Sequence, residues 1–251
     1  MKISLLIPVY NEAPHLPEFL KLIDEIDLGF AKELVFVDDA SRDRSGDILK
    51  EYAFKSETRL HRQSVNMGKG AALRKAIDLA TGDIIVVQDA DFEYQPKDLL
   101  VLLPPVVNGH ADVVYGSRFK KNGVQVHRTY HYFVNRLLTL LSNLMSGLYV
   151  TDMETCYKVF RSDILKNIRL ESARFGFEPE ITAKVARLRI RVQEHPIAYF
   201  PRNYMEGKKI TWKDGIAAFW HIFKFNVIAK PKDYILPSMP AKYRIEGTQW
   251  L

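Results

Sequence analysis

The sequence predicts an α/β fold in which a mostly parallel sheet is covered by helices on both faces. Two observations lead to this prediction. Short segments rich in aliphatic residues alternate with amphipathic helical segments through residues 1–117. Polar motifs follow the strand segments at their carboxyl ends, where the ligands of such sheets bind. The functional site is therefore expected at that edge.

The alternation consists of five strand-like segments joined by four helical ones. Each helical segment is long enough to cross from one parallel strand to the next. The expected strands are 3–9, 33–37, 59–63, 84–88 and 112–115, and the expected helices are 16–26, 43–54, 71–80 and 97–107.

A chain of 251 residues that is 47% hydrophobic can bury one substantial core. Because no low-complexity tract, linker or internal repeat divides it, we expect a single domain over residues 1–230. Its halves would be 1–117 and 118–230, followed by a C-terminal tail over 231–251. The single cysteine excludes an intrachain disulfide and a multi-cysteine zinc site, which favours a reducing, cytoplasmic compartment.

Membrane-crossing segments are not predicted. The N-terminal apolar run is too short for a signal-peptide core, and no small-residue cleavage site follows it. No stretch approaches the roughly 18 apolar residues that span a bilayer, and Pro104-Pro105 interrupts the richest run.

Charge differs between the two halves. Residues 1–117 carry 13 Lys and Arg against 19 Asp and Glu, whereas residues 118–251 carry 23 against 11. An acidic half needs a metal ion to bind a diphosphate, while a basic half attracts an anionic acceptor or membrane surface directly. Nucleic acid is not expected, because the basic residues lack the aromatic-interleaved motifs of common RNA-binding modules.

Two carboxylates, Asp89 and Asp91, follow the most strand-like stretch of the chain. Carboxylates at positions i and i+2 project to the same side of an extended backbone. Their hard oxygens suit Mg²⁺ or Mn²⁺, which keep open positions for the phosphates of a substrate. The pattern predicts a cation and nucleotide-diphosphate site, although an isolated Asp-x-Asp more often only ends a strand.

Further motifs occur in a specific order around this pair. They are "IPVYNE" at 7–12, "VDDAS" at 37–41, "NMGKGAAL" at 66–73, "ATGDIIVVQDAD" at 80–91 and "VVYGSRF" at 113–119. In this order and spacing they resemble the family-two inverting glycosyltransferases of GT-A fold, which include the dolichyl- and polyprenyl-phosphate sugar transferases. The resemblance implies transfer of a sugar from a UDP- or GDP-sugar donor to a polyprenyl or dolichyl phosphate.

The resemblance also implies a donor site. The acidic pair Asp38 and Asp39 would accept hydrogen bonds from the nucleobase, with a structural ion pair as an equal alternative for Asp38. Pro8, Tyr10 and Glu12 would shape the loop beneath the base and ribose, or serve ordinary turn chemistry.

A phosphate contact is expected from the Gly-Lys-Gly that opens the third helix. Gly68 and Gly70 permit close backbone approach, the helix N-terminus favours anions, and Lys69 could reach a phosphate.

The Asp-x-Asp would bind both donor and metal. Asp89 and Ala90 would contact the donor, and Asp91 would be the main metal ligand and a catalytic residue. Asp89 and Glu93 would complete the metal set, with Glu93 at the position where many relatives have Gln. The metal would neutralise the departing diphosphate.

The acceptor chemistry depends on whether a base is needed. A phosphate monoester is already anionic, so it requires cationic positioning and no proton abstraction. Guanidinium groups suit that role, although each arginine alone is more often a surface residue. The residues implied for the acceptor are Arg118, Arg128, Arg202 and Tyr204.

Acids in the basic half are further candidates. Asp152 and Glu154 lie in "TDMETCYKVFR", which resembles the segment that reaches over the donor sugar, where they would touch sugar hydroxyls or act as a base. Glu178 and Glu180 begin an expected helix, where acids also improve the dipole.

Two amphipathic helices are expected near residues 130–148 and 216–227. Lysines around the second suit a helix at a membrane interface. Packing on the sheet or on a second copy in a homo-oligomer is an equal alternative. We expect a cytoplasmic protein that is peripheral at the membrane if this face binds lipid.

Two other functions remain open. Transfer to a soluble hydroxyl acceptor would need Asp152, Glu154 or Glu180 as base, whereas a non-catalytic nucleotide-sugar-binding module would not need both acids of the Asp-x-Asp. The sequence does not identify the sugar, and it favours UDP over GDP only weakly.

Overall fold

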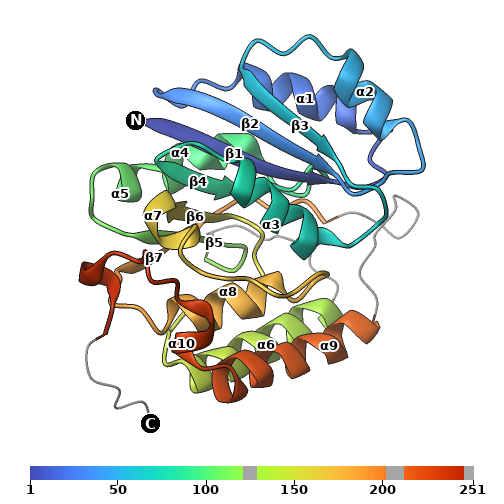
Figure 1. Ribbon diagram of the computed structural model, residues 1–251. Helices are drawn as coiled ribbons and strands as arrows, with labels where there is room; N and C mark the ends of the chain where they lie inside the picture. The colour runs from blue at the N-terminus through green and yellow to red at the C-terminus, as the bar shows by residue number, and fades with distance from the viewer. Residues whose placement is uncertain (121–128, 202–211, 246–251) are drawn as a thin grey trace.

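The computed structural model of the protein describes residues 1–120, 129–201 and 212–245. It contains a seven-stranded sheet with the strand order β3-β2-β1-β4-β6-β5-β7 (Figure 1). Strand β6 runs antiparallel to both β4 and β5, and the other neighbouring strands are parallel. The predicted α/β fold with a mostly parallel sheet is confirmed.

The five strands expected from the sequence are present, with ends that differ by at most two residues. The sequence analysis did not assign bounds to β6 and β7, which extend the sheet beyond β4. The strands are β1 Lys2–Val9, β2 Ala31–Asp38, β3 Glu57–Arg62, β4 Ile84–Val87, β5 Val113–Ser117, β6 Lys158–Arg161 and β7 Val192–Pro196.

Helices connect the strands. Besides short 3₁₀ turns at Pro96–Asp98 and Ala241–Tyr243 and a π-helical turn at Lys224–Ile228, the described residues form ten α-helices. They are α1 Leu16–Glu25, α2 Ser45–Glu51, α3 Lys69–Leu79, α4 Leu99–Leu102, α5 Pro104–Val107, α6 Thr129–Ser146, α7 Ser162–Leu165, α8 Phe177–Val185, α9 Trp212–Phe223 and α10 Pro231–Tyr234.

The prediction of one continuous helix over residues 97–107 is wrong. The structure breaks it into a 3₁₀ turn, α4 and α5, and α5 begins at Pro104. Proline has no backbone N–H to donate, so it can start a helix but interrupts one that approaches from its N-terminal side.

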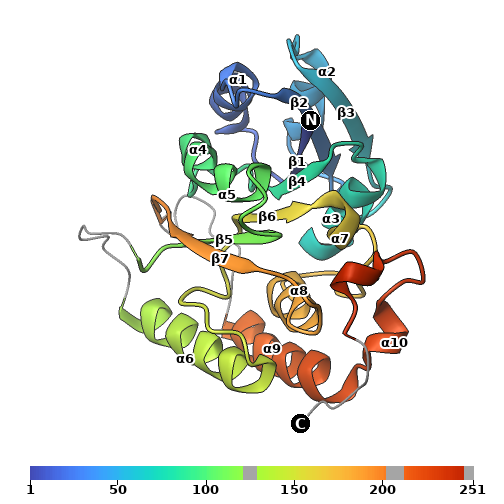
Figure 2. The same cartoon turned by 90° about the vertical axis from the view of Figure 1, so that its left-hand side faces the viewer.

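The core lies on both faces of the sheet. Strands β1, β2 and β4 are almost entirely buried, as expected for strands covered on both sides. Figure 2 shows α1, α4 and α5 on one side of the sheet and α3 and α7 on the other. This frame holds the strand ends rigidly in place.

A second helical layer lies at the β7 end of the molecule. Helices α6 and α9 pack side by side, and α8 lies between them and the sheet (Figures 1 and 2). No helix among the described ranges is long and apolar enough to span a bilayer. The division of one domain into halves at residues 117 and 118 stays a prediction.

Candidate active site

The carboxyl ends of β1, β2 and β4 meet at one edge of the sheet, because β1 pairs in parallel with both other strands. The segments that follow these strands, residues 10–12, 39–41 and 88–93, therefore converge. They contain most of the residues predicted to bind the donor. Ala90, predicted to contact the donor, is buried between the two acids of the Asp-x-Asp.

Backbone strain is concentrated at this edge. In the described part of the chain, the non-glycine residues with positive φ are Asn11 at 51°, Ala40 at 55° and Phe92 at 58°. Each follows one of the three converging strands. A left-handed conformation costs roughly 1–2 kcal/mol for most L-residues, and such residues cluster at functional sites.

Asp39 organises the loop after β3. Its Oδ1 accepts hydrogen bonds from Gln63 Nε2 at 2.9 Å and from the Met67 N–H at 2.8 Å. Its Oδ2 accepts from Asn66 Nδ2 at 2.9 Å and from the Gly68 N–H at 2.7 Å. These four bonds fill the usual capacity of a carboxylate, so in this structure Asp39 shapes the loop of residues 63–68.

Asp38 forms the ion pair that the sequence left open. Its Oδ2 lies 3.4 Å from Arg62 Nη1 and has no hydrogen-bond partner, while its Oδ1 accepts from the Ser41 N–H at 2.8 Å. A direct contact between Asp38 and a nucleobase stays a prediction.

The loop that follows β1, residues 10–12, is fixed by contacts with neighbouring segments. Pro8 belongs to β1, and Tyr10 is half-buried just beyond it. Glu12 is buried, and its backbone N–H donates to Ser45 Oγ at 2.8 Å. Its carbonyl accepts from the first amides of α1. This turn anchors the loop, and its contact with base and ribose stays a prediction.

Lys69 lies between two carboxylates. Its Nζ donates to Asp89 Oδ2 and to Glu178 Oε1, each at 2.9 Å. Burial alone would lower the pKa of Lys69, but the charges of Asp89 and Glu178 outweigh it and hold the pKa well above its ordinary value. The lysine is therefore a fixed cation beside the Asp-x-Asp.

The glycines around Lys69 are packed against a distant segment. The Gly70 and Ala71 N–H groups donate to the carbonyls of Arg174 and Ala173, at 3.2 and 2.9 Å. A Cβ on Gly68, whose φ is +92°, would lie 2.6 Å from the Ala173 carbonyl oxygen. The expected anion cradle at this helix N-terminus thus has two of its amides occupied in this structure, because residues 172–174 fold across it.

The second acid of the Asp-x-Asp lies in a tight turn. Asp91 Oδ1 accepts from the Glu93 N–H at 3.1 Å, and the intervening Phe92 has the strained φ. Glu93 Oε2 accepts from the Tyr199 hydroxyl at 2.9 Å. The turn places Asp91 and Glu93, both half-buried, next to each other at the end of β4.

These residues suit a Mg²⁺ or Mn²⁺ ion, the cofactor predicted from the sequence. Among the described residues, no three His, Cys, Asp or Glu side chains already form a cation cage. Such ions are usually held by one or two carboxylates together with substrate phosphates. Asp91 and Glu93 are the two carboxylates that could hold such an ion, and Asp89 lies beside them in its ion pair with Lys69.

Arg118 and Asp152, predicted for the acceptor and for catalysis, contact each other. Arg118 Nε and Nη2 donate to the two Asp152 oxygens at 2.7 Å each, and the Arg118 N–H adds a bond of 2.9 Å. The guanidinium also lies 5.1 Å from the centre of the Tyr199 ring. Asp152 is fully buried, so in this structure it orients the arginine.

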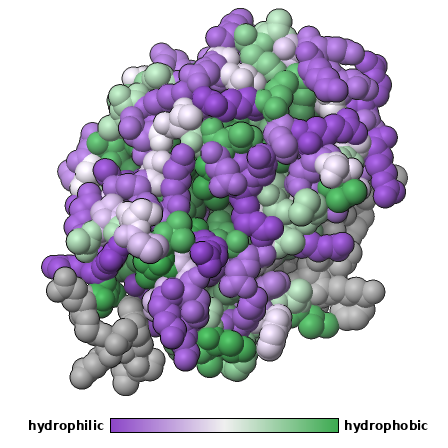
Figure 3. All heavy atoms as spheres, in the orientation of Figure 1, coloured by the Kyte–Doolittle hydropathy of each residue, from purple (hydrophilic) through white to green (hydrophobic). Residues whose placement is uncertain are grey.

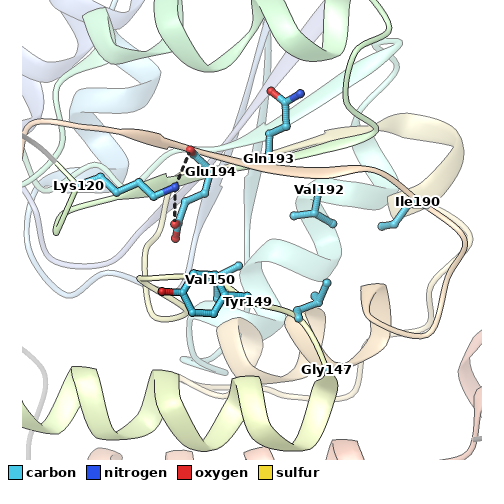
Figure 4. Close-up of a pocket in the computed structure, with 9 residues that line it drawn as sticks. Lys120, Gly147, Tyr149, Val150, Ile190, Val192, Gln193 and Glu194 are labelled. Atoms are coloured by element: carbon cyan, nitrogen blue, oxygen red, sulfur yellow. Dashed lines mark hydrogen bonds and ion pairs between the residues drawn. The ribbon is translucent and has the colours of Figure 1, made fainter.

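Glu194 holds the backbone segment that carries Asp152. Its carboxylate accepts from the N–H groups of Thr151 and Asp152, at 2.8 and 3.0 Å, and lies 3.1 Å from Lys120 Nζ. Figure 4 shows Lys120 and Glu194 beside a pocket of about 350 Å³ between β7 and residues 147–150. None of the residues that line this pocket is a predicted site residue.

Glu154 carries a buried oxygen that has no partner. Oε1 makes no hydrogen bond. Burial raises the pKa of Glu154 to about 8, and repulsion from Glu178 adds to the effect, whereas the Lys158 and Arg118 charges oppose it. Lys158 also donates to the Met153 carbonyl at 3.0 Å and to that of Thr155, which fixes the turn bearing Glu154.

Glu180, the third acid considered as a base, has a structural role. Its two oxygens accept the N–H groups of Glu171 and Ser172 at 2.7 and 2.8 Å, and Lys184 Nζ lies 2.5 Å away. The buried pair anchors α8 to the segment that crosses α3.

Three predicted acceptor residues, Arg128, Arg202 and Tyr204, lie outside the described residues. Sequence reasoning assigned no site contact to Glu178, Tyr199 or Glu194. Only the position of Glu178 at the start of a helix gave any signal, because the partners of these three residues are 43 to 109 residues away in the chain.

Known proteins resemble this chain in sequence and in fold. Residues 4–169 match the family model "Glycosyl transferase family 2". The chain is 34% identical over 218 residues to undecaprenyl-phosphate mannosyltransferase of Micrococcus luteus, covering 83% of this chain and 87% of the relative. It is 30% identical over 227 residues to dolichyl-phosphate beta-glucosyltransferase ALG5D of Trichomonas vaginalis, covering 83% and 68%.

Two solved structures share the fold at lower identity. Glucosyl-3-phosphoglycerate synthase of Mycobacterium tuberculosis, crystallised with Mn²⁺, UDP and phosphoglyceric acid, is 18% identical with a TM-score of 0.68, covering 93% of this chain and 84% of that one. S. aureus TarS with UDP-GlcNAc is 20% identical with a TM-score of 0.58, covering 93% and 69%. Both comparisons concern the fold alone.

Proposed function

The chain belongs to glycosyl transferase family 2, and we propose that it transfers a sugar from a UDP- or GDP-sugar to a polyprenyl phosphate with inversion at the anomeric carbon. The two relatives described above are named for undecaprenyl-phosphate and dolichyl-phosphate acceptors. The main structural support is the convergence of the Asp-x-Asp, Asp39 and Lys69 at one strained edge of the sheet.

The reaction exchanges one C1–O bond for another. An oxygen of the acceptor phosphate attacks C1 from the face opposite the nucleotide, and the bond from C1 to the diphosphate breaks. The nucleoside diphosphate takes the electron pair. Since the attacking phosphate is already anionic, no proton has to be removed.

Donor binding is assigned to the edge formed by β1, β2 and β4. A Mg²⁺ or Mn²⁺ ion held by Asp91 and Glu93 would neutralise the leaving diphosphate. Asp89 faces the donor sugar or ribose, and the Asp39-bound loop forms the floor beside it. Lys69 supplies a fixed positive charge at the same place.

Acceptor binding is assigned to the basic half. Arg118, held by Asp152, stacks near Phe119 and Tyr199, which restricts its orientation. A restrained guanidinium loses little entropy when it binds a phosphate. Arg128, Arg202 and Tyr204 are the further candidates.

A membrane surface is the proposed partner of α6 and α9. Both helices expose large apolar side chains, and green spheres lie among purple ones at the lower edge of Figure 3, where these helices lie. The positive charge of residues 118–251 suits an anionic lipid surface. The exposed side chains include Phe133, Leu137, Leu140, Leu144, Ile216, Trp220 and Phe223.

Label transfer tests the reaction. The protein is incubated with radiolabelled UDP- and GDP-sugars, Mn²⁺ and a short-chain polyprenyl phosphate, and product is extracted into chloroform. Extractable label that disappears in Asp91→Ala is expected. Label only on water-soluble acceptors would instead favour the hydroxyl-acceptor alternative, for which Glu154, with its unpartnered oxygen, is the base candidate.

Flotation tests the membrane contact. The protein should float with anionic liposomes at low salt, and Trp220→Ser with Phe223→Ser should reduce the floated fraction. Equal flotation of this double variant and the wild type would reject α9 as the contact.

A further inference from the structure

Glu178 reaches the donor edge from the other half of the chain. It is 109 residues from Lys69 in sequence, yet its Oε1 lies 2.9 Å from the Lys69 ammonium. That ammonium also binds Asp89 at 2.9 Å. The side chains of Lys69, Asp89 and Glu178 are only 16%, 17% and 5% exposed. The three groups therefore form a largely buried ion network rather than a surface pair.

The position of Glu178 is fixed by packing at the start of α8. Gly176 lies directly on the His221 ring of α9, and a Cβ at Gly176 would come within 2.7–2.8 Å of three ring atoms. Behind Glu178, the buried Glu180–Lys184 pair ties α8 to residues 171 and 172. Glu178 thus has little freedom to follow Lys69 if the lysine moves.

The Lys69 ammonium connects Glu178 to Asp89, the first acid of the Asp-x-Asp. An ammonium group shared by two buried carboxylates is held by both, and removal of one leaves the remaining charges poorly compensated. Asp89 Oδ2 accepts its hydrogen bond from Lys69 Nζ. Asp89 is thus joined through Lys69 to Glu178, which is too far along the chain to belong to the same motif.

We propose that Glu178 is a positioning residue of the donor site, which fixes the Lys69 ammonium and through it the Asp89 carboxylate. The inference rests on the proposed function, because it assigns Asp89 to the donor. Groups that orient ligand-binding residues from behind typically affect affinity 10- to 100-fold. Glu178 would thus affect donor binding without contacting the donor.

A double-mutant cycle tests this pathway. Isothermal titration calorimetry measures the Kd of UDP-glucose and GDP-mannose with Mn²⁺ for the wild type, Glu178→Gln, Lys69→Met and the double variant. Each single change should weaken binding of whichever nucleotide sugar the wild type binds, by roughly 10- to 100-fold. In the Lys69→Met background, Glu178→Gln should add less than about twofold, because its effect acts through the lysine.

Two further variants control the result. Glu25→Gln breaks a solvent-exposed ion pair with Lys55 at 3.2 Å and should leave the Kd within twofold. Gly176→Ala displaces the start of α8 without changing a charge, so it should weaken binding in the wild type but not in Lys69→Met. It also provides the test if Glu178→Gln fails to fold, which thermal unfolding would show.

The outcomes separate the two levels of inference. Additive effects of Glu178→Gln and Lys69→Met, or wild-type affinity in Glu178→Gln, would overturn the positioning role and leave the proposed function intact. A wild type that binds neither nucleotide sugar, and neither UDP nor GDP in the presence of Mn²⁺, would overturn the proposed function and the positioning role with it.

Discussion

Replacing Glu154 with glutamine should stabilise the protein in a pH-dependent manner. The Glu154 carboxyl lies near Glu178 and Asp152, and burial with the Glu178 charge raises its pKa from 4.5 to about 8. Four acids of this region, including Asp89, face the three cations Lys69, Arg118 and Lys158. A proton on Glu154 would balance the charges, and glutamine mimics that protonated carboxyl in shape.

Proton linkage determines whether the free energy of unfolding rises or falls with pH. Between pH 4.5 and about 8, the folded protein keeps a proton on Glu154 that the unfolded chain releases. The free energy of unfolding therefore falls as pH rises through this window and levels off above it. A shift from 4.5 to about 8 corresponds to at most about 5 kcal/mol, and less where water reaches the second oxygen. Glu154→Gln removes this term.

Chemical denaturation at several pH values measures the effect. The free energies of unfolding of wild type and Glu154→Gln should be close near pH 4.5 and should diverge towards pH 8, with the variant more stable. Glu25→Gln, at an exposed site, should run parallel to the wild type. If the free energies of unfolding of Glu154→Gln and wild type changed with pH in parallel, the conclusion that the folded protein keeps Glu154 protonated would be refuted.

For three other substitutions, the structure predicts the direction of the effect on stability or on substrate binding. Ala40→Gly relieves a positive φ and should raise the free energy of unfolding by up to about 1 kcal/mol in urea denaturation; a decrease would contradict the strain. Lys184→Met leaves the buried Glu180 without its ammonium partner and should cost about 3 kcal/mol or more, whereas an unchanged midpoint would argue against that pair. Arg118→Lys loses the bidentate contact with Asp152 and should raise the KM for lipid phosphate more than that for donor; the reverse ratio would reject the acceptor assignment.

Local sequence signals predicted the strands of residues 1–117 well. Apolar runs such as residues 84–88 lie in central strands, and Asp39 and Asp91 appear where such a sheet presents its ligands. The helix 97–107 was mispredicted because its apolar pattern outweighed the missing N–H of Pro104. Periodicity identifies a helical face but does not reveal a break within it.

Contacts between the halves could not be predicted. The Gly68 to Ala71 turn resembled an anion cradle, yet residues 173 and 174 occupy two of its amides. Glu178 was interpreted through the helix dipole, while its role depends on Lys69, which lies far away in sequence. A single sequence contains no information on which distant segments pack together unless a motif specifies it.

The position of the metal tests the central claim most directly. A crystal of the protein grown with Mn²⁺ and UDP or GDP, measured for anomalous scattering, should show one manganese ion beside Asp91 and Glu93 in contact with the diphosphate. A bound nucleotide with no ion beside residues 89–93, or an ion bound elsewhere, would contradict metal-assisted departure of the nucleotide.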